Sequence, residues 1–397
     1  MTNELPDGAD LRDAAAGINP DVVDLRRAIH REPELGLELP RTQAKVLEAI
    51  TGLGLVVSTG ESSTSVVADL DTGTPGPTVL LRGDMDALPL QEDNDVPFQS
   101  VVEGQMHACG HDAHTAMLVG AARLLSEHRN ELRGTVRFMF QPGEEGHHGA
   151  KHMIDEGVLD GVDRAFAIHV TPNIPGGMVA SRGGPLMASA DTFELTVQGR
   201  GGHASTPHFT ADPIPAAAAI VTGLHTMVTR DLDANQPGVL TVGNLHAGTT
   251  TNVIPDRAHI GGTVRALSEH SRTTIHEGIE RVASGTAAAH KCTCEVSIER
   301  GYPVTVNHAD QVELIAEVAA HTLGADQFVT MPTPVMGAED FSYVLQHVPG
   351  AMTFLGLCPD GIDDPRSAAS NHSNLMRISE DGMQAGVALY MAMAMAG

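Results

Sequence analysis

The chain contains no tryptophan, and phenylalanine and tyrosine make up only 3% of its 397 residues. It therefore has no aromatic-rich stretch that would mark an apolar ligand pocket. Basic side chains are scarce as well: 24 lysines and arginines stand against 50 aspartates and glutamates, which gives a net charge of −26. Such a chain would be repelled by the phosphates of nucleic acids and by anionic membrane surfaces. We therefore expect neither nucleic acid nor membrane as a partner.

Cysteines and long apolar runs are also few. Four cysteines do not make a disulfide framework in a chain of this length. The first 24 residues are polar and acid-rich, and they lack the apolar core of a signal peptide. No uninterrupted apolar run approaches the length of a membrane-spanning helix. These features lead us to expect a cytoplasmic protein.

The order of helical and extended patterns predicts two domains. In the first and last parts of the chain the patterns alternate, which indicates a mostly parallel sheet covered by helices on both faces. After a glycine- and proline-rich stretch at residues 172–185, the order becomes strand, helix, two strands, helix and strand, as in ferredoxin-like domains. We therefore predict an α/β domain made of residues 1–180 and 299–397, with a smaller α+β domain, residues 181–298, inserted into it.

The predicted strands are short and are bounded by turn residues. In the larger domain they cover residues 65–70, 78–82, 135–141, 164–170 and 352–357. In the inserted domain they cover residues 192–198, 239–245, 259–266 and 293–298. Helices are expected between them, including one that begins at His114 and one that begins at Glu339.

The run from His107 to Asp112, HACGHD, lies just before an apolar helix. A thiolate at Cys109 and an imidazole at His111 would form a compact metal-binding hook. Asp112 is placed to cap the helix that follows. Taken alone, the same pattern is also compatible with a buried cysteine beside a turn histidine.

Three further polar positions come later in the chain: the pair Glu144-Glu145 and His169 at the ends of strand-like apolar runs, and His372 in a polar loop near the end of the chain. Each has an ordinary interpretation alone, as an acidic turn, a core histidine or a loop histidine. However, the carboxyl ends of parallel strands border a shared ligand crevice. Five side chains would then offer nitrogen, oxygen and sulfur ligands, enough for two divalent ions if one ligand bridges: Cys109, His111, Glu145, His169 and His372. Glu144 would remain as a base, and the pattern favours a metal-dependent hydrolase.

Several motifs occur in an order that resembles a known family. They are RGDMDALP at 82–89, the Cys109 hook, Glu144-Glu145, the His169 strand, GRGGHA at 199–204 and MGAEDFS at 336–342. Together they resemble the amidohydrolase branch of the aminoacylase/carboxypeptidase G metallopeptidases. That branch includes hippurate hydrolases, other N-acyl-amino-acid amidohydrolases and plant auxin-conjugate hydrolases. The resemblance spans nearly the whole chain and implies a catalytic α/β domain with an inserted ferredoxin-like domain that dimerises and acts as a lid.

The resemblance also implies roles for individual residues. Cys109 would bridge two metal ions, and Glu144 would be the general base. His203 would stabilise the oxyanion, while Asn252 and Arg265 would hold the substrate. Asp84 would not bind the metal itself but would orient one of the ligating imidazoles. Mixed sulfur, nitrogen and oxygen ligation suits Zn²⁺, and Mn²⁺, Co²⁺ and Ni²⁺ are also compatible.

The implied reaction is hydrolysis of the amide bond of N-acyl amino acids, with a small substrate that carries a free carboxylate. The implied assembly is a homodimer or a tetramer. Three alternatives remain open from the sequence. The first two are a dipeptidase or carboxypeptidase and a deacetylase of the diaminopimelate pathway, both with the same fold. The third is a metal-binding protein without catalytic activity. The acyl group is not indicated by any sequence feature.

Overall fold

The computed structural model describes residues 5–396, and the chain forms two compact units. Unit 1 is formed by Met1–Leu186, Val306–Thr333 and Asp340–Gly397, and unit 2 by Met187–Thr305 and Pro334–Glu339. The chain passes from one unit to the other within β7 (Gly184–Met187), within β14 (Thr305–Asn307) and at both ends of Pro334–Glu339. Strands β7 and β14 pair as a two-stranded sheet. The outermost predicted domain limits, residues 1 and 397, lie outside the described residues.

Unit 1 contains a mixed sheet of eight strands in the order β1-β2-β4-β3-β5-β16-β6-β15. The strands are β1 (Val56–Thr59), β2 (Val66–Asp71), β3 (Thr78–Asp84), β4 (Thr135–Gln141), β5 (Arg164–Thr171), β6 (Val179–Ser181), β15 (Phe328–Thr330) and β16 (Gly350–Gly356). The central strands β4, β3, β5 and β16 are parallel, whereas β1 and β2 are antiparallel to their neighbours. Nearly every residue of β3, β5 and β16 is buried, as expected for strands covered on both faces.

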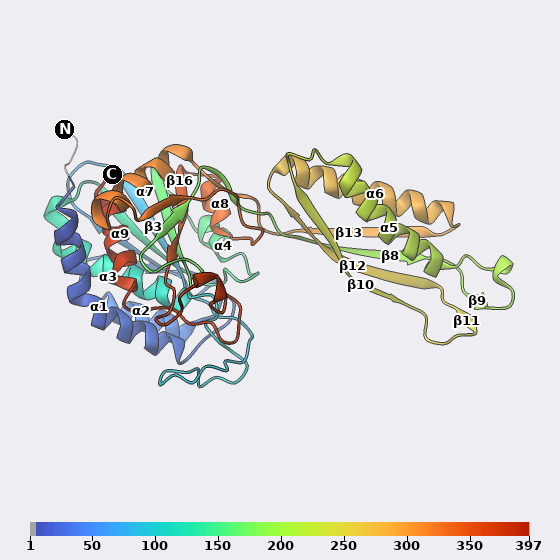
Figure 1. The fold of residues 1–397 in the computed structure, drawn as a ribbon, viewed down its shortest axis with the longest axis horizontal. Helices are drawn as coiled ribbons and strands as arrows, with labels where there is room; N and C mark the ends of the chain where they lie inside the picture. The colour runs from blue at the N-terminus through green and yellow to red at the C-terminus, as the bar shows by residue number, and fades with distance from the viewer. Residues whose placement is uncertain (1–4, 397) are drawn as a thin grey trace. The chain divides into compact units, whose positions relative to one another are not determined.

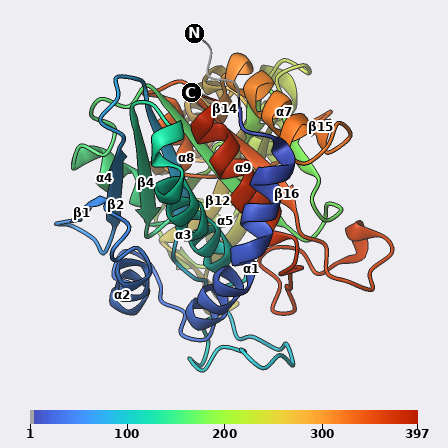
Figure 2. The ribbon, with the colours of Figure 1, turned by 90° about the vertical axis from the view of Figure 1, so that its left-hand side faces the viewer.

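Helices cover both faces of this sheet. They are α1 (Gly8–His30), α2 (Pro40–Ala49), α3 (His111–Glu127), α4 (Gly149–Asp155), α7 (Ala309–Thr322), α8 (Phe341–Leu345) and α9 (Met383–Met395), with short 3-10 turns at Arg129–Glu131 and Pro365–Ser367. Figure 2 shows α1, α3 and α9 side by side on one face, and Figure 1 shows α4 and α8 on the other. From Gly386 onward helix α9 is buried on all sides and almost entirely apolar, as expected for a core helix.

Unit 2 is an antiparallel sheet in the order β10-β12-β8-β13 with two helices packed on one face (Figure 1). Its elements are β8 (Asp191–Gln198), β9 (Gly202–His203), the 3-10 turn Pro207–Phe209, α5 (Pro213–Asp231), β10 (Gly238–Ala247), β11 (Val253–Ile254), β12 (Arg257–Ala266), α6 (Glu269–Ala289) and β13 (Thr293–Arg300). The small pair β9–β11 lies beyond one end of the sheet. This is the predicted β-α-β-β-α-β order, and the predicted fold class is confirmed.

The structure differs from the sequence prediction at short or irregular segments. Strand β1 was not expected, because its four residues are all exposed and show no alternation of apolar and polar residues. Helix α3 begins at His111 rather than His114, and helix α8 begins at Phe341 rather than Glu339. The expected cap by Asp112 is wrong, because the residue before α3 is Gly110, which has a φ of 90°.

Two expectations concern the chain as a whole. All four cysteines are free thiols, in agreement with the absence of a disulfide framework. Over residues 5–396, none of the helices combines the length and the apolar character needed to cross a bilayer.

Asp191, at the start of β8, is expected to make unit 2 sensitive to acid. Its buried carboxylate accepts hydrogen bonds from Nε2 of His276 at 2.8 Å and from Nε and Nη2 of Arg272 at 2.9 and 2.5 Å. Burial raises the pKa of Asp191, but His276 and Arg272 outweigh this effect and hold it at about 2. The stabilisation is therefore complete above the unfolded-state pKa of about 3.9 and is lost as the pH falls through about 2.

Urea unfolding at several pH values tests this expectation. The wild-type midpoint should fall between about pH 4 and pH 2, and Asp191→Asn should lower the midpoint at neutral pH and reduce this dependence. Asp256→Asn is the control, because Asp256 is 62% exposed and lies 3.6 Å from Arg257. Equal pH slopes for the wild type and Asp191→Asn would contradict the assignment.

Candidate metal centre

The carboxyl ends of β3, β4 and β5 lie at one edge of the unit 1 sheet. Asp84 at the end of β3 is opposite Gln141 at the end of β4, and β5 runs parallel on the other side of β3. Glu144 and Glu145 follow β4, and His169 lies near the end of β5. The shared edge that the sequence predicted therefore exists, and it brings these side chains into one region.

A glycine presents Cys109 and His111 at the start of α3. At Gly110, with its φ of 90°, a Cβ atom would lie 2.4 Å from Cγ2 of Val170, so only glycine fits without displacing a neighbour. The Sγ of Cys109 then lies 3.5 Å from Nε2 of His169. Burial raises the pKa of the Cys109 thiol to about 12, so a thiolate at this position requires a cation beside it.

Hydrogen bonds to carbonyl groups orient the two buried imidazoles. Nδ1 of His111 donates to the carbonyl oxygen of Asp86 at 2.9 Å, and Nδ1 of His169 donates to that of Val170 at 2.9 Å. Because a carbonyl can only accept, each Nδ1 carries a proton, and in the neutral ring Nε2 keeps its lone pair. Burial, reinforced by His114, holds the pKa of His169 well below its usual range. Burial also lowers the pKa of His111, but Asp84 and Cys109 outweigh this effect and hold it well above its usual range. Nε2 is therefore the nitrogen left for a metal in each ring, and at His111 the metal would replace a proton.

Glu145 connects this buried cluster to His372 on the C-terminal loop. Nε2 of His372 lies 3.1 Å from Oε1 of Glu145, and the His372 side chain is 55% exposed. Burial raises the pKa of Glu145, but His372 and His111 outweigh this effect and hold the pKa below its usual value. An ionised carboxylate and an exposed imidazole therefore lie together at the border of the site.

Overlapping groups of donor atoms meet the distance requirement for a metal ion. Within each group the donor atoms lie no more than 4.8 Å apart. Three of these groups are Cys109, His111 and His169; Cys109, Glu145 and His372; and His111, Glu144 and Glu145. A further group in unit 1 consists of Asp84, His111 and His114. Ligands about 2.0–2.3 Å from one ion are themselves roughly 3–4.5 Å apart. Thiolate, imidazole and carboxylate donors suit a divalent transition metal, so the residues fit such a centre.

Asp86 is a site residue that the sequence analysis did not identify. Its carboxylate is buried and accepts the backbone N–H groups of Glu144 and Glu145, each at 3.0 Å. Its Oδ1 also lies 3.3 Å from Nδ1 of His111. One carboxylate therefore fixes both the acidic turn and the ring of His111, a possible metal ligand. The available signal was the two-residue spacing from Asp84, which puts both side chains on one side of an extended segment.

Asp84, expected to orient a ligating imidazole, binds a different histidine. Its Oδ1 accepts from Nδ1 of His114 at 2.5 Å, and Nε2 of His114 accepts the backbone N–H of Val170 at 2.8 Å. Both nitrogens of His114 are therefore occupied, and neither remains for a metal. The Oδ2 of Asp84 lies 3.5 Å from Nε2 of His111 and accepts from Nη1 of Arg82 at 2.6 Å.

Asp112 anchors the segment of Cys109 and His111 to α1 instead of capping α3. Its Oδ2 accepts from Nε of Arg26 at 2.7 Å and from Nδ1 of His30 at 2.8 Å. Nε2 of His30 contacts Oε1 of Glu92 at 3.1 Å. Arg26 and His30 are only 3% and 2% exposed. A buried polar network between α1 and the start of α3 thus supports the segment that contains Cys109.

Unit 2 contains the other predicted residues, and it brings two of them together. The pairing of β9 with β11 places His203 near Asn252, whose carbonyl oxygen accepts the N–H of Ala204 at 3.1 Å. Both side chains are exposed. Arg265 lies toward the other end of β12, and the strand from Arg257 to Arg265 spans roughly 26 Å. Unit 2 therefore does not bring Arg265 close to His203.

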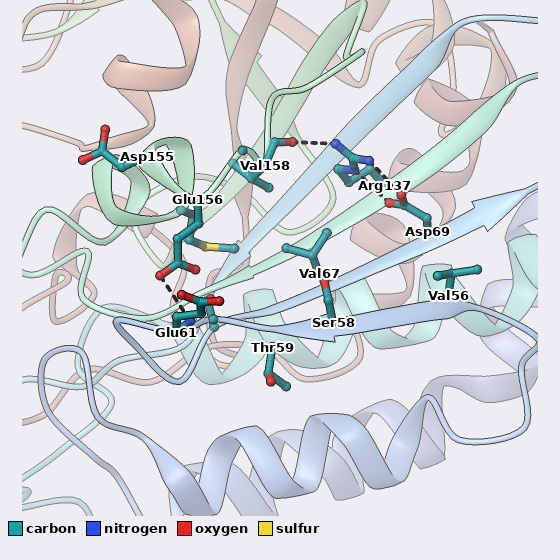
Figure 3. Close-up of a pocket in the computed structure, with 14 residues that line it drawn as sticks. Val56, Ser58, Thr59, Glu61, Val67, Asp69, Arg137, Asp155, Glu156 and Val158 are labelled. Carbon is teal, nitrogen blue, oxygen red and sulfur yellow. Dashed lines mark hydrogen bonds and ion pairs between the residues drawn. The ribbon is translucent and has the colours of Figure 1, made fainter.

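A surface hollow at the edge of the unit 1 sheet contains none of the predicted site residues (Figure 3). It has a volume of about 490 Å³ and lies over β1, β2, β4 and residues 153–158. Arg137 binds both carboxylate oxygens of Asp69, at 2.8 and 2.7 Å, and Glu156 accepts the backbone N–H of Glu61 at 3.2 Å. Because these charged groups pair with one another or with the backbone, the hollow gives no basis for a functional site.

Comparison with known proteins identifies relatives along most of the chain. Residues 80–396 match the family described as peptidase family M20/M25/M40. The IAA-amino acid hydrolase ILR1-like 2 of Arabidopsis thaliana is 41% identical over 95% of this chain and 86% of its own length. Thermostable carboxypeptidase 2 of Saccharolobus solfataricus is 40% identical over 97% of both chains. An N-acetylcysteine deacetylase of Bacillus subtilis is 38% identical over 84% of this chain and 88% of its own.

Solved structures agree with these relatives. A Bacillus subtilis protein, YXEP, described as a dinuclear metal-binding peptidase of the M20 family, superimposes with a TM-score of 0.84. It is 32% identical, and the alignment covers 96% of this chain and 98% of that one. The resemblance inferred from the sequence motifs is confirmed. The chain therefore belongs to peptidase family M20/M25/M40 and is a hydrolase of that family.

Proposed function

We propose that the protein hydrolyses the amide bond of N-acyl amino acids and releases a carboxylic acid and a free amino acid. The observation that carries the proposal is a set of side chains at one edge of the unit 1 sheet: Cys109, His111, Glu144, Glu145, His169 and His372. Two divalent ions held there would supply positive charge that acidifies water and polarises the amide carbonyl. Relatives named IAA-amino acid hydrolase and N-acetylcysteine deacetylase support an N-acyl amino acid as the substrate.

Glu144 is the general base in this proposal, and Glu145 is a metal ligand. Both carboxylates form a donor group with His111, but only Glu145 also forms a group with the thiol of Cys109 and the imidazole of His372. Glu145 is therefore the better ligand. Glu144 can accept a proton from the attacking water and return it to the leaving amine. Its backbone is fixed by Asp86, which keeps the base in place.

His203 is proposed to donate a hydrogen bond to the oxyanion that forms during attack. Its Nδ1 accepts the backbone N–H of Ser205 at 3.1 Å. In the neutral imidazole the ring proton must then be on Nε2. An N–H donor on an exposed turn suits the stabilisation of a developing negative charge.

Arg265 and Asn252 are proposed to hold the substrate. The half-buried guanidinium of Arg265 offers a two-pronged, permanently charged partner for a carboxylate. Within one chain, Arg265 and His203 are too far apart along unit 2 to contact one small molecule. We therefore propose a homodimer in which the His203 turn of one subunit completes the site of the other.

Metal removal is expected to abolish activity. Amine release from a panel of N-acetyl, N-benzoyl and N-indoleacetyl amino acids would be measured with ninhydrin before and after chelation. Mn²⁺, Zn²⁺, Co²⁺ or Ni²⁺ should restore release, because thiolate and imidazole donors prefer such ions. Ca²⁺ is the control, since it prefers oxygen ligands. Release that persists in the stripped protein would contradict the proposal.

A carboxypeptidase is the second candidate, because thermostable carboxypeptidase 2 is 40% identical over 97% of both chains. Arg265 would serve equally well for the terminal carboxylate of a peptide. The same assay should therefore include dipeptides with free and acylated amino termini. Faster hydrolysis of peptides than of every N-acyl amino acid would favour this candidate.

A further inference from the structure

Three ligand-bearing segments of unit 1 meet at a half-buried side-chain amide, that of Asn371. Its Nδ2 donates to the carbonyl oxygen of Cys109 at 2.9 Å and to that of Val170 at 3.2 Å, and it lies 3.9 Å from Sγ of Cys109. Val170 directly follows His169, and Asn371 directly precedes His372. The same Val170 oxygen accepts from Nδ1 of His169. One amide therefore joins the segments of three proposed ligands.

The segment that carries His372 has less support of its own than the other two. Cys109 is anchored by the start of α3, and His169 lies within β5. His372 lies on a loop in a left-handed backbone conformation, with a φ of 69°. That conformation is unfavourable for a residue other than glycine and needs support from its surroundings. The N–H of His372 donates to the carbonyl oxygen of Ala108 at 2.7 Å, and Asn371 adds its two side-chain bonds.

We propose that Asn371 is a positioning residue that fixes His372 in place for metal binding. This inference rests on the proposed metal centre. Loss of the amide should affect the donor group formed by Cys109, Glu145 and His372 more than the group formed by Cys109, His111 and His169. The second group lies on a helix start and a strand, which keep their geometry without Asn371.

Co²⁺ titration of the metal-stripped full chain tests the proposal. Calorimetry would separate two binding events, and the cobalt–thiolate charge-transfer absorption would report on Cys109. In Asn371→Ala, one event should weaken by about 10–100-fold, the range found for residues that support metal ligands. The other event should change little. Asn371→Asp, which matches the shape of the side chain but lacks the N–H donors, should behave in the same way. This variant replaces Asn371→Ala in the experiment if the alanine variant does not fold.

Asn374→Ala is the matched control, because its amide lies on the same loop but binds Asp93. Its two Co²⁺ affinities should equal those of the wild type. The thermal midpoints of the metal-free variants would separate positioning from a general structural role. The proposal is overturned if the Asn371 variants bind both ions as the wild type does, or if both affinities and the metal-free midpoint fall together. A wild-type chain that binds no Co²⁺ would overturn the proposed metal centre itself, and this inference with it.

Discussion

Replacement of Glu144 by glutamine is expected to lower kcat by about 10²–10⁴-fold and to leave the bound metal in place. The amide keeps the size of the side chain but cannot take up a proton at neutral pH. The hydrogen bond from the backbone N–H of Glu144 to Asp86 does not involve the altered group, so the turn should keep its conformation. The measurement combines kcat for the best N-acyl amino acid with the metal content of the purified variant.

Glu145→Gln is the matched control, since it makes the same chemical change at the neighbouring position. Glu145 lies against His372 and belongs to two groups of possible ligands. We expect this variant to lose metal affinity together with activity, and added metal to restore part of the rate. Near-wild-type turnover of Glu144→Gln would remove Glu144 from the role of base. If both variants lost metal to the same extent, the result would indicate that both carboxylates are metal ligands.

The grouping of side chains in the candidate metal centre could be predicted in part because it depends on local patterns. An apolar run followed by a polar residue marks the carboxyl end of a buried strand, and parallel strands end at a common edge. That reasoning leads to Glu144, Glu145 and His169 without any knowledge of the tertiary structure. His372 was also expected as a ligand, but it lies in a polar loop, where the strand-end pattern gives no support, and the resemblance to the family supplied that support.

The residues that support the site could not be predicted in this way, because their partners are distant in the sequence. Arg26 and His30 lie on the buried face of α1, where helical periodicity predicts apolar side chains. Their partner Asp112 is 86 and 82 residues further along the chain. Local patterns contain no information about such a pair. The contact of Asp86 with the turn after β4 belongs to the same class.

Arg82→Met is expected to destabilise unit 1 by about 3–5 kcal/mol, the range found when one partner of a buried ion pair is removed. The guanidinium is 1% exposed and donates to Asp84 at 2.6 Å, to Gln141 at 2.9 Å and to Asp340 at 3.0 Å. Methionine has a similar length but no charge. Asp84 and Asp340 would therefore remain buried without this cation, and the free energy of unfolding should fall.

Urea unfolding followed by circular dichroism would measure this loss against Arg123→Met. Arg123 pairs with Asp21 at 2.7 Å, but their side chains are 42% and 68% exposed. An exposed pair contributes at most about 1 kcal/mol, so the control should remain close to the wild type. Equal unfolding midpoints for the two variants would show that Asp84 and Asp340 do not depend on Arg82. Asp84 would then be held beside His114 by its other hydrogen bonds, and the arginine would have no part in shaping the candidate metal centre.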